Sequence, residues 1–128
     1  MNFIDANNHL NIDLFFEQLQ VVTLKNFFSD LTLQSFDKFF REFFDVRDGM
    51  EYKFETGGYS GCLILGESHI NWHSFPEDKL LKIDIYSCKD IENKVDNVLE
   101  GLYNLMNASY INYSFTKGSK NNVRYQPR

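Results

Sequence analysis

Side chains that can do chemistry gather in the stretch LGESHINWHSFPE, residues 65–77, where a β-sheet would normally carry Val, Ile and Leu. Glu67 and Ser68 are adjacent in it, His73 follows five positions after the serine, and Cys88 comes fifteen positions after that histidine. Serine, cysteine, histidine and glutamate are the residue types that supply nucleophiles, acids and bases in enzymes. This concentration predicts a reactive site in the middle of the chain.

The order Glu67–Ser68 permits a reaction in which the chain cuts itself. The serine hydroxyl attacks the carbonyl carbon of Glu67, and an ester replaces the peptide bond. A base then removes the α-proton of Ser68, Glu67 leaves as a new C-terminus, and the remaining dehydroalanine hydrolyses to a pyruvoyl group. Like other carbonyl cofactors, this group accepts electrons when an amino acid loses CO₂. We therefore expect cleavage into residues 1–67 and 68–128, with a pyruvoyl cofactor formed from Ser68.

The spacing of Ser68 and His73 conflicts with a regular strand. Successive side chains of a strand point to opposite faces, so residues five apart lie on different sides of the sheet. Either the strand bulges between them or the backbone is interrupted. A turn at residues 76–78, where Pro76 cannot donate to a ladder, would fold the next strand back and bring Cys88 near Ser68 or His73.

Two segments alternate apolar residues with the period of a half-buried strand, residues 9–16 and 79–88. Three more segments are rich in β-forming residues and complete the expected strands. They are residues 50–56, which the turn-like GGYSG follows, the long segment 62–75, and residues 109–118.

Phe36, Phe39, Phe40 and Phe43 have the spacing of one helix face and predict a helix over residues 33–46. Thr32 or Ser35 would cap its start, and Gly49 would end it. A second helix is expected over residues 90–106, while residues 17–31 fit neither period cleanly and leave a short helix as one option.

The expected order is therefore β-α-β-β-β-α-β. It predicts one α+β domain over residues 1–128, a two-layer sandwich with an antiparallel-rich sheet and two helices on one face. The other face of the sheet needs a cover, most simply a second copy of the chain. We therefore expect a homodimer.

Composition narrows the classes of function. The 128 residues carry a net charge of −5, and 43% of them are hydrophobic, which is typical of a globular domain. An acidic chain is not expected to bind nucleic acid, and no apolar run is long enough to cross a membrane. The two cysteines have no zinc-site spacing, so we expect no metal, and a start without signal-peptide features favours the cytoplasm.

The motifs ESHINWHSFPE and KIDIYSC resemble the signature of the prokaryotic pyruvoyl-dependent S-adenosylmethionine decarboxylase proenzyme family. That family carries Ser-Glu-Ser-His, then His-Thr/Ser-aromatic-Pro-Glu, then Asp-x-aromatic-Thr-Cys-Gly. GGYSG is similar to its Gly-Val-Ser-Gly, and NNHLNIDLF to its opening Gly-x-His-Leu strand. The resemblance covers residues 7–16 and 52–90, and the spacing from Ser60 to Cys88 follows the family.

The resemblance implies a role for each matched residue. Ser68 would become the pyruvoyl group after a cut behind Glu67, and Ser60 and His73 would assist the processing, with His73 as the base. Cys88 would be the general acid that returns a proton to the substrate α-carbon. The roles implied in substrate binding are contact with the ribose hydroxyls for Glu77 and stacking on the adenine for Phe54. The implied reaction is decarboxylation of S-adenosylmethionine in polyamine and spermidine biosynthesis, by a dimer of cleaved protomers.

Departures from the family pattern leave alternatives open. Gly66 stands where the family has Ser, Lys89 replaces the Gly after the cysteine, and Lys79–Leu81 replaces a Gly-aromatic-small turn. Related enzymes use the same chemistry on L-ornithine or L-arginine, whose cationic side chains would pair with the carboxylates of this region. A non-catalytic regulatory paralogue is a further alternative, although such a chain usually loses the serine or the cysteine. The other cysteine, Cys62, is expected to pack in the core.

Overall fold

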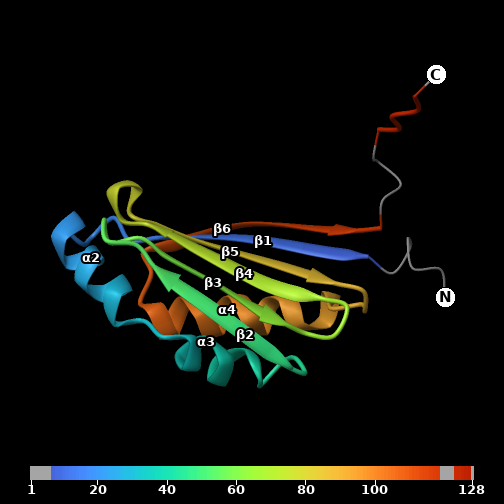
Figure 1. Cartoon of the computed structure of the whole chain (residues 1–128), viewed down its shortest axis with the longest axis horizontal. Helices are drawn as coiled ribbons and strands as arrows, with labels where there is room; N and C mark the ends of the chain where they lie inside the picture. Colours follow the sequence, from blue (N-terminus) through green and yellow to red (C-terminus); the bar gives the residue numbers. More distant parts are fainter. Residues whose placement is uncertain (1–6, 119–122, 128) are drawn as a thin grey trace.

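The computed structural model describes residues 7–118 and 123–127, and its centre is one six-stranded antiparallel sheet in the order β2-β3-β4-β5-β1-β6. Three α-helices lie on the same side of this sheet, and the opposite side is open (Figure 1). The strands are β1 (Asn8–Phe15), β2 (Asp48–Lys53), β3 (Tyr59–Ile64), β4 (His69–Phe75), β5 (Leu80–Ser87) and β6 (Tyr110–Lys117). The helices are α2 (Val21–Asp30), α3 (Leu33–Phe40) and α4 (Val95–Met106), with short 3₁₀ turns η1 (Pro76–Asp78) and η2 (Glu92–Lys94).

The buried face of the sheet follows the alternation of the sequence. Alternate apolar residues of β1 and β5 are almost fully buried, because strand side chains point alternately to the helices and away from them. These residues are Leu10, Ile12 and Leu14 in β1, and Leu81, Ile83 and Ile85 in β5. The strand predictions for these two segments are confirmed.

Aromatic packing joins α3 to the centre of the sheet. Phe36 stacks on Trp72 of β4 with ring centroids 4.1 Å apart, and Phe40 is also fully buried. Gly61 of β3 pairs directly with Trp72, and a Cβ at that glycine would lie 2.1 Å from the indole ring. The absence of a side chain at residue 61 therefore makes room for the only tryptophan of the chain.

The predicted α+β class and two-layer architecture are confirmed, with corrections to individual elements. The described residues contain three α-helices rather than the expected two, because residues 17–31, for which the sequence favoured neither period, contain α2. The first predicted helix ends at Phe40, before the expected Gly49, which lies in β2 against Leu63. The Thr32 hydroxyl caps that helix by accepting from the backbone N–H of Ser35.

The expected long strand over residues 62–75 is a hairpin of two strands, β3 and β4. Gly66 has a φ of +76°, and this left-handed conformation lets the chain reverse between them. The segment GGYSG is likewise divided, because Gly57 and Gly58 precede the strand and its last three residues start β3.

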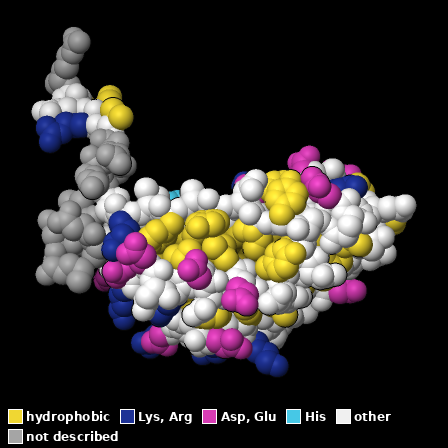
Figure 2. Space-filling view, turned by 180° about the vertical axis from the view of Figure 1, so that it is seen from behind, with side chains coloured by type: hydrophobic (Ala, Val, Ile, Leu, Met, Phe, Trp, Pro, Cys, Tyr) yellow, Lys and Arg dark blue, Asp and Glu magenta, His cyan; other side chains and the backbone are white. Residues whose placement is uncertain are grey.

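The open face of the sheet carries both polar and exposed apolar side chains, and all three histidines of the chain lie on it. Within the described residues no helix packs on this side. Seen from behind, apolar side chains form a band along the molecule (Figure 2). The exposed large apolar residues of α4 and the edge strand β6 are Tyr103, Leu105, Tyr110 and Tyr113. No helix of the described chain is long and apolar enough to span a membrane.

Candidate active site

Ser68 lies in the turn between β3 and β4, one residue before β4 begins. The backbone N–H of Leu65 donates to the Ser68 carbonyl at 2.8 Å and closes the turn. The side chain of Ser68 is buried, with only 7% of the residue exposed. Ser68 nevertheless continues the alternation of β4, because Ile70, Trp72 and Ser74 are also buried and His73 is exposed on the other face. Neither a bulge nor an interruption separates Ser68 from His73 along β4, and the two side chains lie on opposite faces.

Cys88 contacts Ser68 directly. The backbone N–H of Cys88 donates to Ser68 Oγ at 3.0 Å, and Ser68 Oγ lies 3.5 Å from Cys88 Sγ. Antiparallel pairing of β4 with β5 produces this contact. His69 pairs with Tyr86 at the end of the ladder, so Ser68, just before β4, lies beside the residues that follow β5. Ser68 thus has a fixed backbone donor on its hydroxyl and a thiol beside it.

Ser60 and His73 form a second pair on the open face of the sheet. They are directly opposite each other in the β3–β4 ladder, and Ser60 Oγ shares a hydrogen bond of 2.8 Å with His73 Nδ1. Cross-strand neighbours on one face are close enough for such side-chain contacts. The imidazole is exposed, so it is accessible to a molecule that docks on this face.

The two pairs lie apart within one chain. His73 is five positions beyond Ser68, and at roughly 3.3 Å per residue their Cα atoms are about 16 Å apart. The structure therefore brings Ser68 to Cys88 and Ser60 to His73, and it does not bring His73 to the Ser68 of the same chain.

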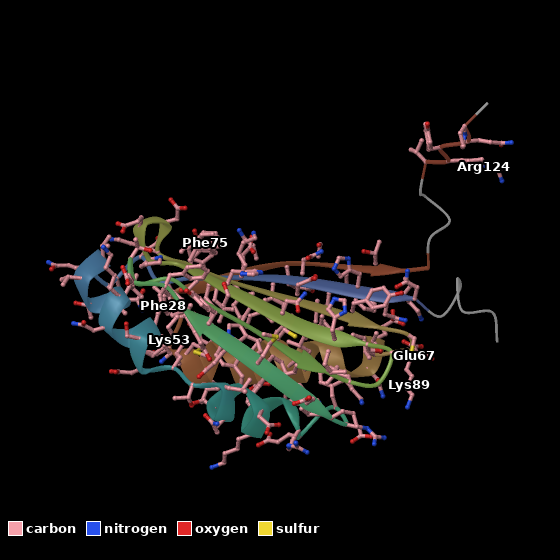
Figure 3. All side chains as sticks on the ribbon, in the orientation of Figure 1. Phe28, Lys53, Glu67, Phe75, Lys89 and Arg124 are labelled. Atoms are coloured by element: carbon pink, nitrogen blue, oxygen red, sulfur yellow. The ribbon has the colours of Figure 1, made fainter. Side chains whose placement is uncertain are left out.

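Glu77 and Phe54 lie at the opposite end of the sheet from Ser68. Glu77 belongs to η1, which follows the last residue of β4, and its carboxylate is 2.9 Å from Lys25 Nζ of α2. Phe54 follows β2 and remains 50% exposed, with its ring 4.7 Å from that of Tyr52. Figure 3 shows this separation, with the labelled Phe75 at one end and Glu67 at the other.

Three cavities surround these residues. One of about 470 Å³ adjoins Ser68 and Cys88 at the end of the sheet, and its lining includes Glu67 and Lys89. Two others open on the uncovered face with volumes of about 480 and 340 Å³, and both include His73 in their lining. Ser60 contributes to the smaller of these two.

The model of the family described as S-adenosylmethionine decarboxylase matches residues 8–118. The chain belongs to this family.

Curated relatives of the decarboxylase family agree with this match. An S-adenosylmethionine decarboxylase proenzyme of Bacillus velezensis is 39% identical over 61 residues, 46% of this chain and 48% of that protein. A proenzyme of Clostridium botulinum is 51% identical over 37 residues, which cover 29% of this chain and 32% of the relative. The matched parts thus span about a third to a half of the length of these curated relatives.

A solved structure has the same fold. The adenosylmethionine decarboxylase from Aquifex aeolicus superposes with a TM-score of 0.61 and 21% sequence identity, over 94% of this chain and 97% of that one. The resemblance to the decarboxylase family that the motifs indicated is confirmed.

Some contacts within this decarboxylase-family fold had no clear sequence signal. His9 forms an ion pair with Asp84 on the open face, and His69 stacks on Tyr86 with ring centroids 5.4 Å apart. The alternation of β1 and β5 placed His9 and Asp84 outward, but the register that joins them depends on long-range pairing. Cys62 is a correction, because it lies half-buried on the open face, in the lining of the cavity with His73, and not in the core.

Asp90 and Tyr59 of the described chain have pKa values shifted by their surroundings. The Asp90 carboxylate, which lines the Ser68 cavity, accepts from the backbone N–H of Glu92 and from Lys117, and both lower its pKa. Burial, followed by the hydrogen bond to Glu51, raises the pKa of Tyr59. Tyr59 therefore stays a neutral donor to Glu51, which also accepts from the backbone N–H of Leu33 at the start of α3.

Proposed function

We propose that the chain is a proenzyme that cleaves itself between Glu67 and Ser68 and then decarboxylates S-adenosylmethionine in polyamine biosynthesis. The observation that carries the proposal is the contact of Ser68 Oγ with the backbone N–H and the thiol of Cys88. Family membership supports the reaction, since the matched relatives are named S-adenosylmethionine decarboxylase proenzymes. We also propose that the protein works in the cytoplasm.

Cleavage would begin at the Ser68 hydroxyl. Its oxygen attacks the Glu67 carbonyl carbon, the C–N bond breaks, and the nitrogen of Ser68 takes up a proton as the ester forms. A base then takes the Ser68 α-proton, and the Glu67 carboxylate leaves. The double bond that remains shifts to an imine, water adds, and ammonia departs, which leaves the pyruvoyl group at residue 68. An exposed turn suits this reaction because its backbone is free to rearrange outside the ladder.

The residues around Ser68 fit the pyruvoyl group. Ser68 Oγ departs in the Glu67 carboxylate, so the Cys88 N–H that now donates to it would become available to the keto oxygen of the group. When bound, this group supplies an electron acceptor for the loss of CO₂ from an amino acid. The Cys88 thiol lies beside it and would return a proton to the substrate α-carbon as the general acid.

The base for the cleavage would come from a second copy of the chain. His73 is the proposed base, with Ser60 orienting its ring, but this histidine lies about 16 Å along β4 from its own Ser68. We therefore propose a homodimer in which the open faces meet and each protomer brings Ser60 and His73 to the partner's cut. This arrangement would also cover the polar cavities on that face.

The same dimer gives Glu77 and Phe54 a route to the substrate. Both lie toward the His73 end of the sheet, so a partner that supplies His73 also carries them toward Ser68. Phe54 is exposed and available for stacking on an adenine. Glu77 would exchange its ion pair with Lys25 for the ribose hydroxyls of S-adenosylmethionine.

L-Ornithine or L-arginine is the second candidate substrate, with the same chemistry. The observation that favours it is the group of carboxylates at this end, Glu55 in the turn after β2 and Glu77 with Asp78 in η1. A cationic side chain would pair with such a group.

Mass spectrometry and radiolabel release test these proposals together. Purified protein should contain the fragments 1–67 and 68–128, whereas Ser68→Ala should remain one chain. Ser29→Ala, at an exposed position of α2 away from the open face, is a matched control and should be cleaved. Release of CO₂ from carboxyl-labelled S-adenosylmethionine, ornithine and arginine then ranks the substrates. An uncleaved wild-type chain contradicts the proposed chemistry, and cleaved protein that turns over none of the three supports the regulatory alternative.

A further inference from the structure

Glu67 and Lys89 are two exposed ionic residues at the site of the proposed cut. Both line the cavity of about 470 Å³ beside Ser68 and Cys88. Figure 3 shows the two labelled side chains at the same end of the sheet. Lys89 is also the position where the family pattern has Gly, so its side chain is a particular feature of this protein.

The other acidic groups of this cavity already have cationic partners. The Asp45 carboxylate is 2.8 Å from the Arg47 guanidinium. Asp90 is 3.2 Å from Lys117 Nζ, which lies outside the cavity lining.

Lys94, another cationic side chain of the cavity lining, also has contacts of its own. Lys94 Nζ donates to the Phe43 carbonyl at 2.6 Å and lies over the ring of Phe44. Among residues 7–118 and 123–127, neither the Glu67 carboxylate nor the Lys89 ammonium has an ion-pair partner. Of the charged side chains that line the cavity, these two are therefore available to form a new ion pair within it.

Hydrogen bonds of the backbone fix the position of the Lys89 main chain. The N–H of Lys89 donates to Ser87 Oγ at 3.1 Å, directly after the Cys88 N–H that binds Ser68 Oγ. The Cys88 N–H thus joins the end of β5 to the turn, and the Lys89 N–H closes a local turn onto Ser87. The Lys89 side chain is thereby tethered one residue from the Ser68 contact, while its ammonium remains exposed.

Cleavage after Glu67 changes the charge at this place. The neutral peptide carbonyl becomes a carboxylate, so the end of the fragment carries two negative charges on one residue. We propose that Lys89 binds this new C-terminal carboxylate of Glu67 and keeps the cut end of the β3 fragment beside the cavity. The lysine ammonium has three donors on a flexible stem, so it can bind the new carboxylate in more than one orientation. This inference rests on the proposed cleavage.

In this role Lys89 is a positioning residue. The cut removes the covalent link between β3 and β4, and the three residues after β3 gain conformational freedom. An ionic contact at the end of the fragment limits that freedom and keeps residues 65–67 in the cavity wall. Lys89 thus stabilises the cleaved protein and has little effect on the uncleaved one.

A comparison of cleaved and uncleaved protein tests the contact. Lys89→Gln is made in the wild-type background, which cleaves, and in the Ser68→Ala background, which does not. The melting temperature should fall by about 1–4 °C in the cleaved protein and by much less in Ser68→Ala. The difference should shrink in 1 M salt, where the screening length is about 3 Å. Lys89→Arg should restore most of the lost melting temperature. Lys38→Gln removes an exposed charge on α3, and it should change the melting temperature by the same amount in both backgrounds.

Carbon-13 NMR gives a second readout that stability alone does not move. With glutamate labelled at its backbone carbonyl carbon, only Glu67 of the cleaved protein carries that carbon as a free carboxylate, because residue 128 is an arginine. Its resonance at neutral pH should shift in Lys89→Gln and not in Lys38→Gln.

The outcomes separate the two proposals. If wild-type protein shows no free carboxylate signal, the proposed cleavage itself is wrong. If cleavage occurs but Lys89→Gln lowers the melting temperature equally in both backgrounds and leaves the resonance in place, the carboxylate contact is wrong and the cleavage stands. A Lys89→Gln variant that no longer cleaves also overturns the contact, because the lysine would then act before the cut.

Discussion

The backbone N–H of Cys88 donates a hydrogen bond of 3.0 Å to Ser68 Oγ across twenty residues of sequence. This one contact joins the β3–β4 turn to the end of β5, and it places the thiol of Cys88 3.5 Å from the same oxygen. A donor on the hydroxyl orients the oxygen before any reaction, so the proposed nucleophile is held in place for its attack on the Glu67 carbonyl. The proposed precursor and the proposed acid are therefore positioned by the sheet itself, not by a flexible loop.

Cys88→Ala should separate processing from turnover. The backbone N–H remains, so Ser68 keeps its hydrogen bond and the chain should still be cleaved. Loss of the proposed general acid should lower the rate of CO₂ release by about 10²–10⁴-fold. Fragment masses and CO₂ release are measured on the same preparation. Cys62→Ala removes the other cysteine and should retain turnover, so an equal loss in both variants would contradict a specific role for Cys88.

Local patterns predicted much of this fold from the sequence. The alternation in β1 and β5 gave the buried face of both strands, and the Phe36–Phe40 spacing gave the helix that stacks on Trp72. The β3–β4 turn was missed because residues 62–75 are β-prone on both sides of Gly66, and a single glycine in a strand pattern also fits a bulge. α2 was left open because its Val, Thr and Phe residues have weak helix propensity.

Long-range pairing limited what the sequence could say about the site. Spacing indicated that Cys88 approaches Ser68 or His73, and the register of β4 with β5 selects Ser68. The ion pair of Glu77 with Lys25 joins η1 to a helix that the sequence did not establish. Such contacts depend on how elements dock, which no local period encodes.

Gly61→Ala should destabilise the protein through Trp72. A Cβ at residue 61 would lie 2.1 Å from the indole, so the ring or the strand must move. Overpacking of this kind costs about 1–3 kcal/mol. Urea unfolding followed by tryptophan fluorescence measures the free energy of unfolding. Gly58→Ala is the matched control, because a Cβ at residue 58 would lie 3.5 Å or more from its nearest neighbours. The free energy of unfolding should therefore fall much less in this variant. Equal losses would show that the indole packing is not the cause.

Asp90 should make stability depend on pH in the acid range. The Glu92 N–H and Lys117 lower its pKa below the ordinary value of 3.8, so the folded state favours the charged form. The stabilisation is therefore complete above 3.8 and is lost as the pH falls through the lowered value. Melting curves from pH 6 to pH 2.5 should show a smaller acid-dependent loss for Asp90→Asn than for wild type. Parallel pH profiles would contradict the assignment.

His73→Ala should block cleavage in a homodimer and be rescued in a mixed one. Within one chain His73 lies about 16 Å along the strand from Ser68, so the proposed base acts on the partner's chain. In a mixture with Ser68→Ala, the His73→Ala protomer keeps its serine and receives an intact histidine from its partner. Co-expression with different affinity tags, followed by mass spectrometry, should find the His73→Ala chain cut and the Ser68→Ala chain whole. If the His73→Ala chain remains uncut in the mixed dimer but is cut when imidazole is added, the base acts within its own chain and the open faces do not share a site.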